Sequence, residues 1–217
     1  MDKFTYLTGG LSLEAANKVL ILLHGRGGSA SDMLNFIKGF KAGDFAIIAP
    51  QAINNSWYPY SFLEAQKNDS SLNLALVYLD QIIMELESSG FKKSQFYFLG
   101  FSQGACLTLE YTTRNAAKYG GIIAFTGGLI GNTIMKARYN GNFDATPVFI
   151  GSSDPDIHVP VERVKNSAKL MTLMGANVNT IIYQNMGHTI NEDEIMHCNA
   201  ILANDRTINN SEKIDNK

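Results

Sequence analysis

Short, continuous apolar runs alternate with segments of helical periodicity along most of the chain. The five strongest runs cover residues 19–23, 45–49, 96–99, 122–125 and 148–150. A strand that is covered on both faces has such a pattern, because both sets of its alternating side chains are buried. A sixth, weaker run covers 178–183. We therefore predict buried strands at these positions.

Between the runs, apolar residues recur every three or four positions, which indicates amphipathic helices. Clear examples cover 72–86, with Gly90 as a stop signal, and 161–174. Asn191 followed by Glu194 predicts the capped start of a last helix. This alternation predicts an α/β protein with a mostly parallel central sheet and helices on both faces. Ligands of such sheets bind beyond the carboxyl ends of the strands.

A candidate nucleophile follows the run at 96–99. The residues Gly100-Phe101-Ser102-Gln103-Gly104 form the pattern G-x-S-x-G, and a helical pattern comes next. This is the setting of a nucleophile elbow, in which a strained turn exposes a serine oxygen at the end of a strand. The two glycines leave room for neighbouring backbone. Ser102 is therefore predicted to attack an electrophile.

An acid and a base follow the next two strands in the order that this hydrolase fold uses. Two aspartates, Asp154 and Asp156, lie in the loop after 148–150, and His188 lies in the loop after 178–183. The order nucleophile, acid, base is that of an α/β-hydrolase. Ser102, one of the two aspartates and His188 are thus predicted to form a triad.

The glycine-rich loop at 24–28 has two interpretations. Its backbone, together with the N–H of Gln103, suits an oxyanion hole. The spacing from Gly25 to Gly27 and Ala30 also fits a dinucleotide fingerprint. That alternative needs an acid at the end of the next strand, where this chain has Gln51. The hydrolase interpretation is therefore preferred, with no cofactor and no metal, and His24 is interpreted as structural.

Composition narrows the class of protein further. The 18 Lys and Arg residues nearly balance the 20 Asp and Glu residues, so no basic excess points to nucleic acid. No secretory signal and no apolar stretch long enough to span a membrane is apparent. The two cysteines suit a reducing compartment, so we expect a cytoplasmic protein. We expect one domain over residues 1–203 and a polar, disordered tail over 204–217.

Four segments together resemble the phospholipase/carboxylesterase family of α/β-hydrolases, including its acyl-protein thioesterases. They are residues 23–25, 100–104, 156–160 and 187–188. The resemblance implies an α/β-hydrolase fold, with Ser102 as nucleophile and His188 as base. It also implies an oxyanion hole made by the backbone N–H groups of Arg26 and Gln103. The acid of the family precedes a Val-Pro pair, and counting back from Val159 favours Asp156.

The expected activity is hydrolysis of carboxylic esters with short or medium acyl or aryl groups. Trp57, Phe62 and Leu129 are predicted to contact the substrate, since each follows a strand at the same edge of the sheet. A thioesterase or lysophospholipase acting on longer chains is the alternative enzyme. A catalytically silent binding protein is the alternative of another class. The expected partner is a small ester, and the chain is compatible with a homodimer.

Overall fold

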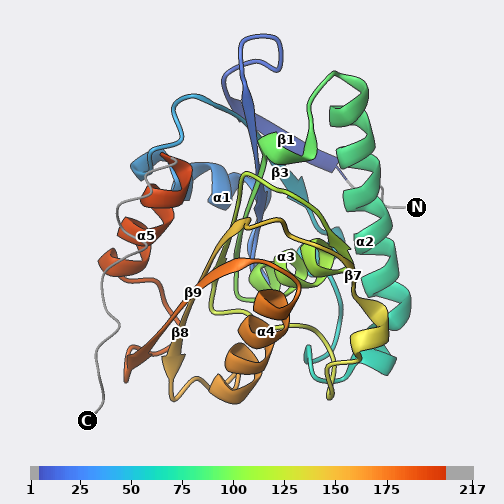
Figure 1. Ribbon diagram of the computed structural model, residues 1–217, viewed down its shortest axis with the longest axis vertical. Helices are drawn as coiled ribbons and strands as arrows, with labels where there is room; N and C mark the ends of the chain where they lie inside the picture. The colour runs from blue at the N-terminus through green and yellow to red at the C-terminus, as the bar shows by residue number, and fades with distance from the viewer. Residues whose placement is uncertain (1–4, 204–217) are drawn as a thin grey trace.

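Seven strands form one sheet in the computed structural model, which describes residues 5–203 (Figure 1). The sheet order is β1-β3-β2-β4-β6-β8-β9. Its strands are β1 (Thr5–Gly10), β2 (Lys18–Leu23), β3 (Phe45–Gln51), β4 (Phe96–Phe101), β6 (Gly121–Phe125), β8 (Pro147–Asp154) and β9 (Asn177–Gln184). Two short strands, β5 (Asn115–Ala116) and β7 (Asn140–Gly141), pair separately.

All six predicted strands are confirmed, and each pairs in parallel with its neighbours from β3 to β9. The hydrophobic pattern does not predict β1, which pairs antiparallel with β3 at the edge of the sheet. Most of its residues are exposed, so it lacks the continuous apolar pattern that identifies the buried strands. The prediction of a mostly parallel sheet is therefore correct.

Helices cover both faces of the sheet. They are α1 (Ala30–Phe36), α2 (Ala65–Ser88), α3 (Gln103–Arg114), α4 (Val161–Leu173) and α5 (Glu192–Leu202), with short 3-10 turns at Ile37–Gly39, Ile53–Asn55, Lys93–Gln95 and Lys136–Arg138. In Figure 1, α1 and α5 lie on one side of the sheet and α2, α3 and α4 on the other. The predicted helices at 72–86 and 161–174 correspond to α2 and α4, and the last helix, predicted to start at Asn191, corresponds to α5.

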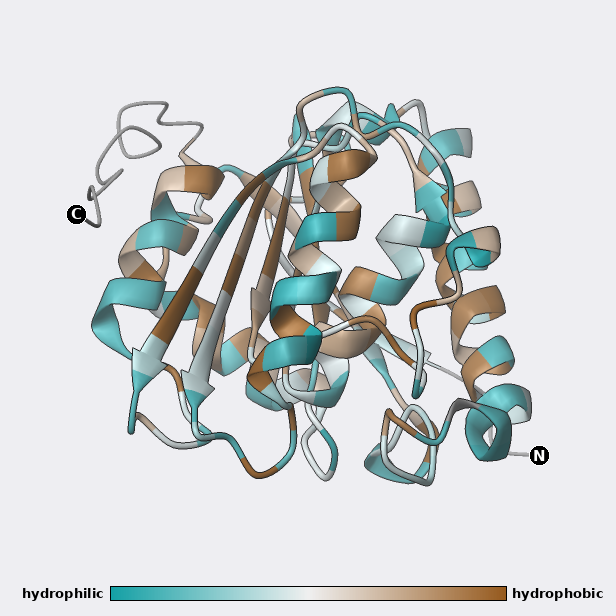
Figure 2. Ribbon diagram, turned by 60° about the horizontal axis from the view of Figure 1, so that its bottom comes forward, coloured by the Kyte–Doolittle hydropathy of each residue, from teal (hydrophilic) through white to brown (hydrophobic). Residues whose placement is uncertain are grey.

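The core has two parts because alternate side chains of each strand point to opposite faces. In β2, Val19 and Ile21 pack with the residues of α2, α3 and α4, whereas Leu20 and Leu22 pack with those of α1 and α5. Figure 2 shows the central strands as largely hydrophobic and the helices as divided between a hydrophobic and a hydrophilic side. This burial on both faces explains the uninterrupted apolar runs in the sequence.

The parallel strands bring their carboxyl ends to one edge of the sheet. The arrows of β8 and β9 both end at the bottom of Figure 1. The loops after β2, β4, β8 and β9, which carry the predicted site residues, therefore lie at this edge. The predicted tail at 204–217 lies outside the described residues.

Candidate active site

Ser102 lies on the tight turn between β4 and α3. Its backbone has φ 53° and ψ −116°, an unusual conformation for a residue other than glycine. A Cβ atom on Gly100 would come within 2.4 Å of the Gly104 carbonyl oxygen, and one on Gly104 within 2.0 Å of the Leu23 oxygen. Both positions therefore require glycine, and the turn has the geometry expected of a nucleophile elbow.

Three loops bring Ser102, His188 and Asp156 into one hydrogen-bonded chain. The distance from the Ser102 hydroxyl oxygen to Nε2 of His188 is 2.8 Å. The distance from Nδ1 of His188 to Oδ2 of Asp156 is also 2.8 Å. With its proton on Nδ1, the imidazole donates to Asp156 and accepts from Ser102. This arrangement can take a proton from the serine.

The structure places Asp156, and not Asp154, next to His188. Asp154 is the last residue of β8 and pairs with Gln184 in the sheet. Asp156 lies two residues further on, and Oδ1 of its buried side chain accepts hydrogen bonds from the backbone N–H groups of His158 and Val159. Burial opposes ionisation of this carboxyl, but His188 and the two N–H groups together outweigh it and lower the pKa of Asp156. The carboxylate is therefore held charged and oriented.

The predicted oxyanion loop lies against Ser102. A Cβ atom on Gly25 would be 3.5 Å from Cβ of Ser102. Gln103 is the first residue of α3, so its N–H has no acceptor within the helix. The segment that carries Arg26 therefore lies beside the serine, and so does the N–H of Gln103.

The side chains of Arg26 and Gln103 have structural contacts that the sequence did not predict. The Arg26 guanidinium donates to the carbonyl oxygens of Pro59 and Tyr60, both at 2.6 Å. The Gln103 amide accepts from the N–H of Trp57 at 3.0 Å and donates to the Tyr58 oxygen at 2.8 Å. Arg26 thus connects the loop at 57–60 to the predicted oxyanion loop, and Gln103 connects it to the nucleophile turn.

A cavity of about 590 Å³ opens beside Ser102. Its lining includes His188 and, of the three predicted substrate contacts, Phe62. Trp57 and Leu129 do not line it, which corrects the prediction that these two residues contact the substrate. Trp57 is 2% exposed and its indole N–H donates to the His24 oxygen. Leu129 is fully buried, and its N–H donates to Ser167. Both residues pack in the interior instead of facing the cavity.

The structure also argues against the dinucleotide alternative. The N–H of Ala30, at the start of α1, donates to the Gln51 side chain at 2.9 Å. Ser29 and Asp32 form a capping box at the same helix end. These contacts occupy the N–H groups that a pyrophosphate would need. His24 is buried and accepts from the N–H of Ala52, in agreement with a structural histidine.

Cys106 is the one cysteine in the lining of the cavity. Burial raises the pKa of its thiol to about 11, so it stays protonated near neutral pH. Both cysteines are buried and free. Among residues 5–203, no cluster of His, Cys, Asp and Glu could hold a metal ion. None of the helices in that range is long and apolar enough to cross a membrane.

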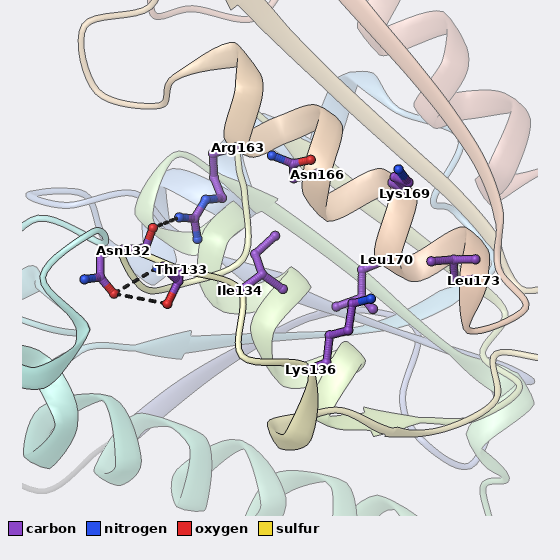
Figure 3. A pocket seen from close by; sticks show the side chains of 9 residues that line it. All are labelled: Asn132, Thr133, Ile134, Lys136, Arg163, Asn166, Lys169, Leu170 and Leu173. Carbon is purple, nitrogen blue, oxygen red and sulfur yellow. Dashed lines mark hydrogen bonds between the residues drawn. The ribbon is translucent and has the colours of Figure 1, made fainter.

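A second cavity of about 420 Å³ lies between the segment at 132–136 and α4 (Figure 3). Arg163 lies in this cavity and donates to the carbonyl oxygens of Leu129 and Asn132. Lys136, Lys169 and Leu173 contribute to the same lining. The predicted triad residues are absent from the lining of this second cavity. The guanidinium of Arg163 therefore joins α4 to the neighbouring loop.

A buried carboxyl, Glu194, fixes the start of α5 just after the His188 loop. Its Oε2 accepts from the N–H of Asn191, and its own N–H donates to the Asn191 side chain, both at 2.9 Å. The other oxygen, Oε1, is buried without a hydrogen-bond partner among the described residues. Burial raises the pKa of Glu194 to about 7, against the opposing effect of the Asn191 N–H.

We predict that the free energy of unfolding falls less between pH 5 and pH 8 in Glu194→Gln than in the wild-type protein. The folded chain keeps the Glu194 proton up to about pH 7, whereas the unfolded chain releases it near the ordinary value of 4.5. Raising the pH through this range therefore lowers the free energy of unfolding, by about 1–3 kcal/mol. Glutamine keeps the capping box but does not ionise. Urea unfolding of both proteins at the two pH values measures the difference, and equal losses would contradict the prediction.

The structure has the features of an α/β-hydrolase. They are the parallel sheet order, the strained serine turn and the hydrogen-bonded chain of Ser102, His188 and Asp156. Residues 12–204 match the phospholipase/carboxylesterase family. The chain belongs to this family. The resemblance found in the sequence is thereby confirmed.

Several known proteins are similar to this chain. A crystal structure of a phospholipase/carboxylesterase from Dyadobacter fermentans is 49% identical with a TM-score of 0.91, over 93% of this chain and 97% of that one. Acyl-protein thioesterase 1 of Saccharomyces cerevisiae is 29% identical over 147 residues, which are 64% of this chain and 61% of that protein. The chain thus matches about three fifths of the length of such curated relatives.

One further neighbour supports the fold alone. A Bacillus cereus carboxylesterase has a TM-score of 0.76 at 16% identity, over 93% of this chain and 94% of its own. The shared architecture therefore extends to proteins with little sequence in common.

Proposed function

We propose that this protein hydrolyses carboxylic esters with a Ser102–His188–Asp156 triad and an acyl-enzyme intermediate. The observation that carries the proposal is the continuous hydrogen-bonded chain from Asp156 through His188 to Ser102, with 2.8 Å at each step. Membership in a hydrolase family and the cavity beside Ser102 support it.

The proposed reaction is acyl transfer to Ser102, followed by hydrolysis of the acyl-enzyme. His188 takes the proton of Ser102 as the serine oxygen attacks the ester carbonyl. The N–H groups of Arg26 and Gln103 stabilise the resulting oxyanion. When the C–O bond to the alcohol breaks, His188 returns the proton to the leaving oxygen. Water then attacks the acyl-enzyme by the same route and releases the acid and free Ser102. Asp156 keeps the imidazole oriented and stabilises its charged form.

The substrate that the cavity favours has a short or medium acyl group. Tyr58, Phe62 and Cys106 are buried side chains in its lining, and they give the cavity an apolar inner wall. Its volume of about 590 Å³ suits a small ester. We expect activity to be highest on such esters and to fall for palmitoyl esters.

We expect a small fluorophosphonate to add one adduct to the wild-type protein and none to Ser102→Ala. Only a serine that is activated by a base reacts readily with this reagent. Intact mass spectrometry gives the number of adducts, and circular dichroism shows whether both proteins are folded. If the folded wild-type protein gives no adduct, the triad is inactive and a silent binding protein becomes the better explanation.

A thioesterase is the second candidate, because most of the curated relatives that match the chain are named acyl-protein thioesterase 1. Thioesters and oxygen esters pass through the same acyl-enzyme, so the triad alone does not separate them. A matched pair of butanoyl oxygen ester and thioester, and the same pair with palmitoyl chains, distinguishes the two. A higher kcat/KM for the palmitoyl thioester would favour the thioesterase.

A further inference from the structure

An exposed apolar side chain lies at the wall of the cavity, directly after the triad acid. Ile157 is 88% exposed, the largest exposed fraction of any large hydrophobic side chain among residues 5–203. It lines the catalytic cavity together with His158. A single exposed isoleucine on a surface needs no explanation, but one in the wall of a reaction cavity is available to contact substrate.

The backbone around Ile157 is held in place. The N–H groups of the next two residues, His158 and Val159, donate to Oδ1 of Asp156 at 2.7 and 2.8 Å. The Val159 side chain is buried. The loop therefore turns tightly around the carboxylate and presents Ile157 outward.

The mechanism indicates which part of an ester would meet this side chain. The alcohol oxygen must receive its proton from Nε2 of His188, so the alcohol part lies beside that imidazole. The His158 ring packs edge to face against the His188 ring, with 4.7 Å between centroids. Residues 157 and 158 are thus on the side of the base.

The loop at 58–62 forms another part of the cavity lining. Tyr58 and Tyr60 lie in the loop that Arg26 and Gln103 hold through hydrogen bonds to its carbonyl oxygens. Phe62 follows in the same loop and lines the same cavity. An acyl part whose carbonyl oxygen faces the oxyanion donors can pack against Phe62 in this loop, which leaves Ile157 free to contact the alcohol part.

We propose that Ile157, next to His158, is a specificity-determining residue that binds the alcohol part of the substrate and favours esters of apolar alcohols. This inference rests on the proposed function. Covering an isoleucine with an alkyl chain removes apolar surface of both from water, which stabilises the complex. Ile157 should then raise kcat/KM for esters of longer alcohols and have no effect on kcat/KM for esters with longer acyl groups.

Two ester series test the inference in the full-length protein. One keeps the acetyl group and lengthens the alcohol from methyl to butyl to hexyl, and the other keeps methanol and lengthens the acyl group over the same range. For Ile157→Ser, kcat/KM for hexyl acetate relative to methyl acetate should fall about tenfold, which corresponds to about 1.4 kcal/mol. The ratio of methyl hexanoate to methyl acetate should not change.

Two further variants serve as controls. Leu173→Ser removes another exposed apolar side chain, 68% exposed, which lines the second cavity (Figure 3), and it should leave both series unchanged. Ile157→Leu keeps the apolar area and should restore the hexyl acetate ratio. This rescue separates lost contact with the alcohol from a disturbed loop.

Three results would overturn the inference. They are an unchanged hexyl acetate ratio in Ile157→Ser, an equal fall in the acyl series, and a change of oligomeric state with unaltered kinetics. In each of these cases the wild-type protein still hydrolyses esters and reacts with the fluorophosphonate, so the proposed function stands. If the wild type hydrolyses neither series and takes no adduct, the proposed function fails and this inference fails with it.

Discussion

Asp156→Asn should lower kcat for a short ester by about 10⁴-fold, whereas Asp154→Asn should stay within a few-fold of the wild type. The Asp156 carboxylate accepts from Nδ1 of His188 at 2.8 Å. An asparagine there can turn its NH₂ group toward Nδ1, which forces the proton to Nε2 and removes the acceptor that Ser102 needs. The negative charge that stabilises the imidazolium is lost at the same time.

The pair of variants is matched in chemistry and differs in position by two residues. In Asp156→Asn the side-chain amide retains an oxygen that can accept from the N–H groups of His158 and Val159, so the loop should keep its shape. Single-turnover kinetics on both variants, with thermal unfolding as a check of folding, measure the effect. If Asp154→Asn shows the larger loss, the assignment of the acid is wrong.

The fold was largely predictable because its strands are buried on both faces. A strand such as β2 has apolar side chains at every position from Val19 to Leu23, and this pattern needs no knowledge of its neighbours. The edge strand β1 is different, since it is stabilised by backbone pairing with β3 and most of its residues are exposed. Such pairing leaves little trace in the hydrophobic pattern.

The site residues were predictable where they lie in loops that directly follow predicted strands. Ser102 and His188 each lie directly after a strand or within a few residues of its end, and the parallel sheet brings the two loops together. Asp154 and Asp156 could not be separated from the residues alone. Their difference arises where β8 ends, because Asp154 still pairs with Gln184.

Substrate contacts were harder to predict because aromatic and aliphatic side chains pack as readily as they bind. Trp57 and Phe62 lie in the same loop, yet the indole N–H of Trp57 finds a buried carbonyl and Phe62 lines the cavity. The loop takes this shape through Arg26 and Gln103, whose partners are backbone carbonyl oxygens. Any residue can supply such an acceptor, so no sequence pattern reveals the contact.

Gly104→Ala should lower kcat at least 100-fold and destabilise the fold by about 1–3 kcal/mol. The new Cβ would lie 2.0 Å from the Leu23 oxygen and 2.6 Å from the His24 oxygen. Both are backbone atoms, so no side chain can rotate away, and α3 must move from β2. Ser102 and Gln103 would move with the helix, while the oxyanion loop follows β2.

Gly43→Ala is the control, since a Cβ there meets no atom within 4 Å and the position is not strained. It should leave kcat unchanged and should not lower the stability. Thermal unfolding and kcat of both variants, measured on the same ester, compare the two positions. Wild-type kcat in a folded Gly104→Ala protein would show that the reaction tolerates a displaced elbow. That result would contradict the view that close contact between β2 and α3 aligns the serine with its oxyanion donors.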